Sequence, residues 1–311
     1  MKFWVGTTDN QWFNYLADCR LDEVNFWIPS AKPLLTNAPI GMPFLFKLKN
    51  PYNHIAGGGF FVGNSNLPLS LAWEVFGEKN GASSFDEFQR LIGRHILDQK
   101  SDPDIGCMII ANPVFLKPHD WMENPEGWSR NIVRGKFYDS NEWDGALIWN
   151  QFSMIFANSD AQSRQAQYSD VQILDDVALY GEPILVQPRL GQSAFRILVT
   201  DAYQRRCAIT GENTLDVLDA AHIVPYSKSG DHNVTNGLLL RTDFHKLFDK
   251  GLVSVTPEYQ IKVSPRIRES YFNGKAYYRL ENQPLTVLPG NTSMRPDRDK
   301  LEWHYQNVYQ G

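Results

Sequence analysis

The sequence predicts a two-domain chain of the α+β class. The 311 residues, 42% of them hydrophobic and 21% charged, fit two ordinary domains that each bury a core. Strand-like patterning dominates the first half, whereas the second half begins with helical spacing and continues as strand, loop, strand and helix. We expect a first domain at residues 1–156, a partly helical linker at 157–186 and a second domain at 187–311.

The first domain shows three segments with the pattern of β-strands. Residues 43–49 alternate apolar and other side chains, residues 57–63 are an apolar run flanked by glycines, and residues 104–116 read as a long buried strand. Residues 70–96 have helical spacing in two pieces, and Ser84 stands where the second piece needs an N-cap. These features predict a curved, mostly antiparallel sheet with helices.

The second domain follows a change in composition. Residues 157–170 are small and polar, which is typical of a connecting segment. Residues 192–207 then place apolar side chains at helical spacing, and residues 252–265 have alternating valines on both sides of a Thr-Pro pair. We therefore expect a helix at the start of this domain and a hairpin further on.

Between that helix and that hairpin lies a segment with an unexpected imidazole. His222 stands in a short apolar strand that Pro225 ends, and three leucines after an Asn-Gly turn form a second strand. Thr242 is placed to cap a short helix that stops at Gly251. On that helix His245 and Asp249, four residues apart, share one face.

Cysteine use and the lack of long apolar runs bear on the compartment. Cys19, Cys107 and Cys207 form no CxxC pair, so they predict neither a disulfide framework nor a four-cysteine zinc site. The N-terminus turns polar after five residues, and no apolar run reaches the length of a membrane span. We expect a soluble, untargeted protein of the cytoplasm, with no membrane partner.

The net charge of −5 at first speaks against a nucleic-acid partner. The charge is uneven, however, because residues 187–311 carry +3 and residues 1–186 carry −8. A C-terminal half that leans positive is compatible with contact to phosphate.

The segment "AAHIVPYSKSGDHNVTNGLLLRTDFHKLFDKG" (220–251) resembles the HNH nuclease motif, or ββα-metal finger, in the branch with AAHI, NGLLL and DxHxLFDxG. A lone histidine would more often be a core residue bonded to a carbonyl, but three matched positions in the right local elements reverse that reading. The resemblance implies His222 as general base, His245 as a ligand of Mg²⁺, Mn²⁺ or another divalent cation, and Asn236 as the residue that holds loop and histidine in place. His232 reads as a loop residue, structural if anything.

Two departures from the family pattern concern metals. Many HNH sites have Asp or His directly before the base, but this chain has Ala221 there, so Asp219 is the nearest upstream ligand, with Asp243 and Asp249 as alternatives. Related nucleases often hold a structural zinc with two CxxC pairs, whereas Cys207 is followed by Thr210 where its partner would be. We expect no structural zinc.

Basic side chains near the motif are candidates for DNA phosphate binding. They are Arg241, Lys246 and Arg205, with Arg206 beside the last. For each of them, a solvated surface charge is about as good an interpretation as a phosphate contact.

The first domain resembles the PUA-like superfamily, including EVE and ASCH domains, in the order of "NFWIPS" (25–30), "PIGMPFLFKLKNP" (39–51) and "IAGGGFFVGNS" (55–65). The resemblance implies a PUA-like β-barrel that reads a modified base flipped out of the duplex. Stacking needs an aromatic face and edge recognition an amide, so Asn25, Phe26, Trp27 and Trp73 are the pocket candidates, against the alternative that each is core. A basic patch would also be needed, to which Lys32, Lys47, Lys49 and Arg130 are possible contributors.

Together these resemblances predict a metal-dependent HNH endonuclease directed to double-stranded DNA with modified bases, foremost modified cytosine. Such fusions resemble modification-dependent restriction enzymes that defend bacteria against phages, and cutting two strands favours a homodimer on DNA. The alternatives are an HNH endonuclease without modification dependence and a catalytically inactive DNA-binding protein.

Overall fold

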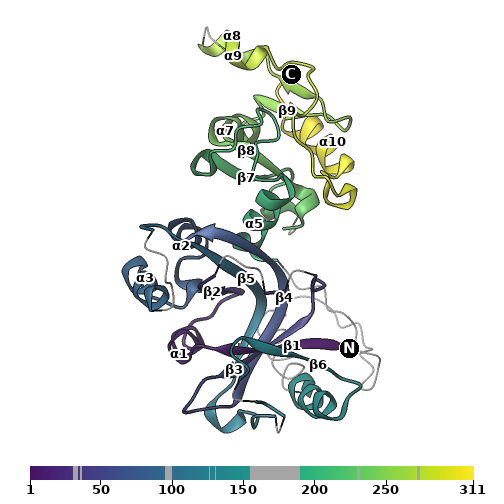
Figure 1. Cartoon of the computed structure of the whole chain (residues 1–311). Helices are drawn as coiled ribbons and strands as arrows, with labels where there is room; N and C mark the ends of the chain where they lie inside the picture. The colour runs from purple at the N-terminus through teal and green to yellow at the C-terminus, as the bar shows by residue number, and fades with distance from the viewer. Residues whose placement is uncertain are drawn as a thin grey trace. The chain divides into compact units, whose positions relative to one another are not determined.

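The structure is a computed structural model that describes residues 1–30, 34–35, 37–94, 100–125, 127–129, 131–154, 190–229, 232–271 and 274–311. The chain divides between Arg189 and Leu190 into two compact units, called here the N-terminal unit and the C-terminal unit (Figure 1). The α+β class is confirmed. The expected linker at 157–186 lies outside the described residues.

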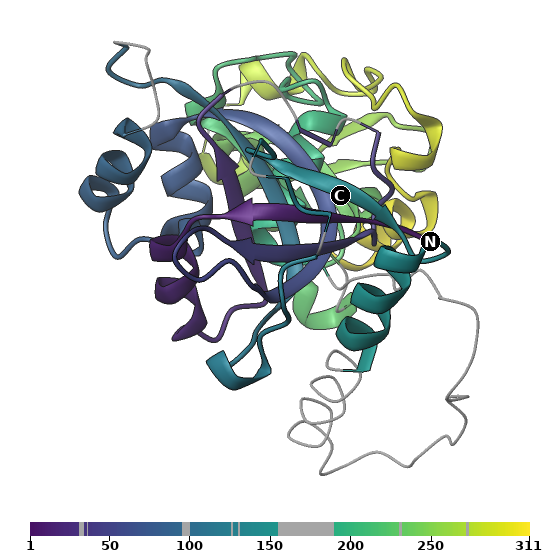
Figure 2. The same cartoon turned by 60° about the horizontal axis from the view of Figure 1, so that its bottom comes forward.

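A six-stranded sheet in the order β2–β5–β4–β3–β1–β6 is the centre of the N-terminal unit. Only the β1–β3 pairing is parallel among the described pairs, and Figure 2 shows how strongly the long strands β4 and β5 curve. The curved, mostly antiparallel sheet expected from the sequence is therefore confirmed. The strands are β1 (Lys2–Thr8), β2 (Glu23–Ile28), β3 (Pro43–Leu48), β4 (Ile55–Pro68), β5 (Asp104–Phe115) and β6 (Gly135–Asp139).

Helices follow the strands at the predicted places. Residues 143–154 are also helical, and the other elements are α1 (Asn10–Ala17), α2 (Leu69–Phe76), η1 (Gly77–Asn80), α3 (Phe85–Gly93) and η2 (Pro118–Asp120). The predicted break between two helical pieces is the short 3₁₀ turn η1. Ser84 caps α3 as expected, because its hydroxyl accepts a hydrogen bond from the backbone N–H of Glu87 at 3.3 Å.

The sheet buries apolar side chains on both faces. Trp4 packs with Phe26, Phe44 and the residues of α1 on one face, whereas Phe3 packs with Phe152 on the other. Successive residues of a strand point to opposite faces, so neighbours in β1 belong to different clusters. Much of the high aromatic content therefore forms this two-sided core.

The C-terminal unit is built on two small antiparallel sheets. Its elements are α5 (Gln192–Ala202), η3 (Leu215–Val217), β7 (Leu218–His222), α6 (Tyr226–Ser229), η4 (Val234–Asn236), β8 (Gly237–Arg241), α7 (Thr242–Asp249), β9 (Val253–Val255), β10 (Ile261–Val263), α8 (Arg266–Tyr271), α9 (Lys275–Tyr278), η5 (Thr292–Met294) and α10 (Arg298–Asn307). β7 pairs with β8 and β9 with β10, which confirms the predicted strand–loop–strand–helix order and the hairpin. In Figure 1, α7 lies beside β7 and β8.

Two local predictions need correction, and one is confirmed. The helix expected over 192–207 ends at Ala202, and the backbone then turns through residues with positive φ at Gln204 and Arg205. Thr242 does not cap α7, because its hydroxyl donates to the carbonyl of Val217 at 3.1 Å. Gly251 does follow the helix end, with φ +66.

His304 of α10 supports α7 from the side of the core. The ring is 2% exposed and stacks on Phe248 of α7 at 3.7 Å between centroids. Its Nε2 lies 3.1 Å from the Phe248 carbonyl oxygen and its Nδ1 lies 2.9 Å from Ser254 Oγ. Burial lowers the pKa of His304 to about 4 from an ordinary value of 6.5.

This burial predicts an acid-sensitive C-terminal unit. Below pH 6.5 His304 is protonated in the unfolded chain, whereas in the folded chain it stays neutral down to about pH 4. The contribution of neutral His304 to the free energy of unfolding is therefore complete above pH 6.5 and is lost as the pH falls toward 4. Between pH 7.5 and pH 5 we expect the loss to be about 2 kcal/mol. Urea unfolding of the wild type and His304→Gln at both pH values measures it. Equal pH dependence in the two proteins would contradict the assignment, and exposed His119→Ala is the control.

Candidate active site

The first group of the site joins β7 to α7. Nδ1 of His245 lies 3.3 Å from Oδ2 of Asp219, and Nε2 of the same ring lies 3.4 Å from Oδ2 of Asp249. The side chains of His245 and Asp219 are 27% and 36% exposed, so solvent and a ligand can reach them. The imidazole is thus held between two carboxylates at the surface.

Strand geometry explains why Asp219 reaches α7. Asp219 and Ala221 are two residues apart in β7, so their side chains point to the same face, and His222 points to the other. Ala221 is fully buried under the helix side of the strand, while Asp219 is only partly buried. The carboxylate missing at position 221 is therefore present on the same face two residues earlier.

Asp243, the other carboxylate considered from the sequence, takes a different partner. Arg241 donates to both of its oxygens, from Nε at 2.6 Å and from Nη2 at 2.8 Å. The hydrogen bonds from Arg241 hold the pKa of Asp243 below its usual value. Of the three carboxylates, Asp219 and Asp249 contact His245 and Asp243 does not.

The second group of the site surrounds His222 at the end of β7. Its ring stacks on Phe195 of α5 at 3.9 Å between centroids and 11° between planes. Its Nε2 lies 3.0 Å from Nδ1 of His232, whose ring stacks in turn on Tyr226 of α6 at 4.0 Å. Packing and a hydrogen bond therefore both orient the His222 imidazole.

Gly237 makes room for this stacking. It is the register partner of His222 across the β7–β8 pair. A Cβ on Gly237 would lie 2.4 Å from Val199 Cγ2 and 3.1 Å from the Phe195 ring, so any other residue would clash with these two side chains of α5. The Asn-Gly pair is thus not a two-residue hairpin turn: Asn236 ends η4 and Gly237 begins β8.

Asn236 fastens the chain immediately after His222. The side chain is fully buried; its Oδ1 accepts from the backbone N–H of Val224 and its Nδ2 donates to the carbonyl of Val224, both at 2.9 Å. The backbone carbonyl of Asn236 also accepts from the N–H of Ile223 at 2.9 Å. The amide therefore pins the loop end to the strand end, in the way expected for a residue that positions His222.

The two predicted imidazoles do not bond to each other. His245 has Asp219 and Asp249 as its partners, and His222 contacts His232. Asp219 and His222 are three residues apart, which is about 10 Å along an extended strand. The two groups therefore lie toward opposite ends of β7, and strand alternation turns their side chains to opposite faces.

The donor set around His245 fits a hard divalent cation. Mg²⁺ takes oxygen donors, keeps several waters and is usually held by one or two carboxylates together with substrate phosphates. Within the described ranges, no group of three or more His, Cys, Asp or Glu side chains could hold a metal ion by itself. Asp219 and His245 would supply part of such a shell, and phosphate and water oxygens the rest.

The predicted phosphate-binding residues have different surroundings. The Arg241 guanidinium is engaged by Asp243, and Nε of Arg205 lies 3.4 Å from Asp201. Lys246 is an exposed residue of α7, one position after His245. Lys246 is thus the better placed of the three for a backbone contact.

The predicted base-pocket residues are divided between two faces of β2. Asn25 is fully buried and its Nδ2 donates to Asn80 Oδ1 at 2.8 Å, and the Trp27 indole donates to the Asn80 carbonyl at 3.0 Å. Trp27 and Trp73 both contact Phe88, at 6.2 and 5.9 Å between centroids.

Phe26 points the opposite way, into the core. It is 7% exposed and packs on Trp12 and Phe44. Strand alternation therefore turns Phe26 away from its neighbours in β2, and the amide nitrogen of Asn25 bonds inside the fold, so neither side chain is presented at the surface.

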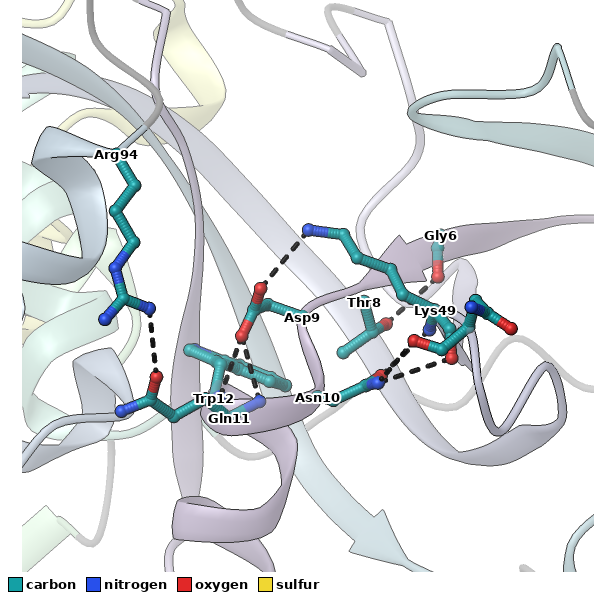
Figure 3. Close-up of polar contacts among 9 residues, drawn as sticks. Gly6, Thr8, Asp9, Asn10, Gln11, Trp12, Lys49 and Arg94 are labelled. Carbon is teal, nitrogen blue, oxygen red and sulfur yellow. Dashed lines mark hydrogen bonds and ion pairs between the residues drawn. The ribbon is translucent and has the colours of Figure 1, made fainter.

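Of the four candidates for a basic patch on the N-terminal unit, the two in the described ranges, Lys47 and Lys49, each have a partner within that unit. Lys47 is 5% exposed, its ammonium donates to Asn53 Oδ1, and burial lowers its pKa. Lys49 pairs with Asp9, the N-cap of α1, at 3.2 Å (Figure 3). Lys32 and Arg130 lie outside the described residues.

The N-terminal unit has a cavity elsewhere. It has a volume of about 490 Å³ and lies at the edge strand β6 and the segment before β3. Phe137, which is 47% exposed, lines it and contacts the edge of Trp4 at 4.7 Å. Its other lining residues include Lys2, Leu34, Leu35, Asn37 and Met42.

Sequence reasoning missed this cavity and the role of His232. No local pattern indicates either, since the cavity joins segments about 100 positions apart and His232 stands in a polar loop. The one sequence feature that points to the contact is the presence of two histidines, ten residues apart, at the two sides of one loop.

Comparison with known proteins agrees with the geometry of the C-terminal unit. A model of the HNH endonuclease family matches residues 207–256. No curated protein matches the chain. Among solved structures, a mutant ZmASCH protein from Zymomonas mobilis is 7% identical, with TM-score 0.31, over 47% of this chain and 95% of that one. The "modification dependent TagI restriction endonuclease" is 15% identical, with TM-score 0.30, over 98% of this chain and 81% of that one.

Among the helices in the described ranges, none has the length and apolar character that a membrane crossing requires. The family match spans β7, η4, β8 and α7; His222 lies in β7, Asn236 in η4 and His245 in α7. Residues 207–256 therefore form an HNH endonuclease domain, and the chain that carries it is an enzyme of the DNA-hydrolysing class.

Proposed function

We propose that the chain is a metal-dependent endonuclease with His222 as general base and with Asp219 and His245 as metal ligands. The observation that carries this assignment is the 3.3 Å contact between Asp219 and His245 on the same strand–helix unit that holds His222. One strand then presents the base at one end and a cation ligand at the other.

The chain's own residues would act as follows. His222 accepts a proton from a water molecule as the water oxygen attacks phosphorus, and the bond from phosphorus to the leaving sugar oxygen breaks. Asn236 and the Phe195 ring hold His222 while this happens. A bound divalent cation supplies electrostatic stabilisation of the phosphate charge. Lys246 contacts the DNA backbone.

We expect Mg²⁺, with Mn²⁺ as a substitute, because the carboxylate of Asp219 and the phosphate and water oxygens that would complete the shell are the donors that these cations prefer. Cys19, Cys107 and Cys207 are all free thiols, which fits the cytoplasm. Two strands need two active sites or two visits, so we expect the enzyme to act on double-stranded DNA as a homodimer.

The N-terminal unit is proposed to direct cutting to modified bases, foremost modified cytosine, as in phage-defence restriction. Support comes from the cavity of about 490 Å³, which is in the size range of ligand sites and large enough for a flipped base. Phe137 offers a half-exposed aromatic face for stacking. This cavity takes the place of the pocket expected at Asn25 and Phe26.

Digestion of matched plasmids tests the proposal. Plasmids with 5-methylcytosine, 5-hydroxymethylcytosine, N6-methyladenine or no mark are incubated with the full chain and Mg²⁺ or Mn²⁺. We expect a modified-cytosine plasmid to be cut in preference. Phe137→Ala should reduce that preference about tenfold or more, since stacking on an aromatic ring contributes about 1–3 kcal/mol per base.

The matched control is Trp143→Ala, because Trp143 is 80% exposed in the same unit and does not belong to the cavity lining described above. Equal cutting of all plasmids would support an HNH endonuclease without modification dependence. Binding without cutting under any metal would support an inactive DNA-binding protein.

A further inference from the structure

A second histidine lies against the proposed base. His232 Nδ1 is 3.0 Å from His222 Nε2, which is hydrogen-bond distance between two ring nitrogens. The two histidines are ten residues apart, and the loop that carries His232 leaves β7 and returns to β8. Nothing in the assigned roles of the HNH residues requires an imidazole at position 232.

Two aromatic rings, Phe195 and Tyr226, keep this pair in register. Phe195 stacks on His222 with 11° between the planes, and Tyr226 stacks on His232 with 12° between the planes. The two flanking rings come from α5 and α6, so two elements hold the imidazoles of β7 and the loop from outside. Stacking on one face leaves the ring edges, where the nitrogens lie, to make the hydrogen bond.

A hydrogen bond between two neutral imidazoles has one donor and one acceptor. We propose that His232 is a positioning residue for His222: its Nδ1 accepts the Nε2–H of His222 and thereby sets the tautomer of the base. His222 then takes the proton of the attacking water at its other ring nitrogen, Nδ1. This inference rests on the proposed function, because it assigns His222 as the base.

The same bond stabilises the product of proton transfer. When His222 gains a proton it becomes an imidazolium, and a bond from a charged donor to a neutral acceptor is about twice as strong as a neutral one. The extra stabilisation from this hydrogen bond therefore arises when His222 takes the proton and not when DNA binds. His232 should accordingly affect kcat and leave KM nearly unchanged.

The test compares His232→Ala with His232→Asn in the full chain. The side-chain oxygen of asparagine can take the place of Nδ1 as an acceptor, whereas alanine cannot. Steady-state cleavage of the plasmid that the wild type cuts best, at saturating Mg²⁺, gives kcat and KM. We expect His232→Ala to lower kcat about tenfold, which corresponds to about 1.4 kcal/mol, and His232→Asn to restore most of it.

Controls separate this role from folding and from the proposed function. Thermal unfolding checks that the variants are folded, and exposed His119→Ala should match the wild type. A kcat of His232→Ala within twofold of the wild type would overturn the inference, as would equal loss in both variants. If the wild type does not cut, or His222→Ala cuts normally, the proposed function fails; if His222→Ala is inactive and His232→Ala is not, only the inference fails.

Discussion

His222→Ala should lower the rate of DNA cleavage by about 10²- to 10⁴-fold, the contribution that a positioned general base makes. The ring lies at the end of β7, is stacked on Phe195 and is bonded to His232, so the fold holds it in one orientation. Removing it leaves water without a proton acceptor at the phosphate. Single-turnover cleavage of plasmid DNA at saturating Mg²⁺ measures the effect.

DNA binding by the same variant should change little. His222 acts on the proton of water, and the binding energy comes mainly from contacts to the DNA backbone. A gel-shift titration in the presence of Ca²⁺ gives the affinity without cleavage. A cleavage rate of His222→Ala within a few-fold of the wild type would rule out this residue as the base.

Asp219→Asn and His245→Ala should each lower the cleavage rate on the order of 100-fold or more at a fixed Mg²⁺ concentration. Even residues that only hydrogen-bond to a metal ligand change metal affinity or activity by about 10–100-fold. The two side chains come from different elements and lie 3.3 Å apart, so either substitution removes one of the two proposed metal ligands. Raising the Mg²⁺ concentration should recover part of the rate in Asp219→Asn. A chelator should abolish cleavage by the wild type.

Asp216→Asn is the matched control for the carboxylate. Asp216 is exposed and three residues before Asp219, so its loss alters the local charge equally without touching His245. Its rate should equal that of the wild type. If Asp216→Asn and Asp219→Asn were equally impaired, general charge and not ligation would explain the effect, and cleavage that persists in chelator would exclude a metal requirement.

Local sequence signals predicted the central strands of the N-terminal sheet and the strand, loop, strand and helix of the C-terminal unit. Alternation in residues 43–49 and the apolar run at 104–116 became β3 and β5, and Ser84 caps α3. The His222, Asn236, His245 spacing correctly indicated strand, loop, strand and helix. Such signals depend on neighbours within a few positions, which is why they can be read from the chain alone.

Side-chain partners were less predictable. The sequence put Asp219 first and left Asp243 and Asp249 as alternatives, and the structure brings Asp219 to His245 and pairs Asp243 with Arg241. Phe26 and Asn25 are adjacent in sequence, yet β2 turns one into the core and the other toward Asn80. Partners across elements depend on register and helix placement, which no local pattern specifies.

The sequence by itself determined that this chain has an α+β fold and that one short strand and one helix in its C-terminal half carry the histidines of an HNH domain. The tertiary structure decided which carboxylate meets His245, that His232 meets His222, and that the cavity of the N-terminal unit lies beside Phe137. The physical reason is distance along the chain. Secondary structure follows from interactions within one or two turns, whereas a site is made by groups that only packing of the whole core brings to hydrogen-bond distance.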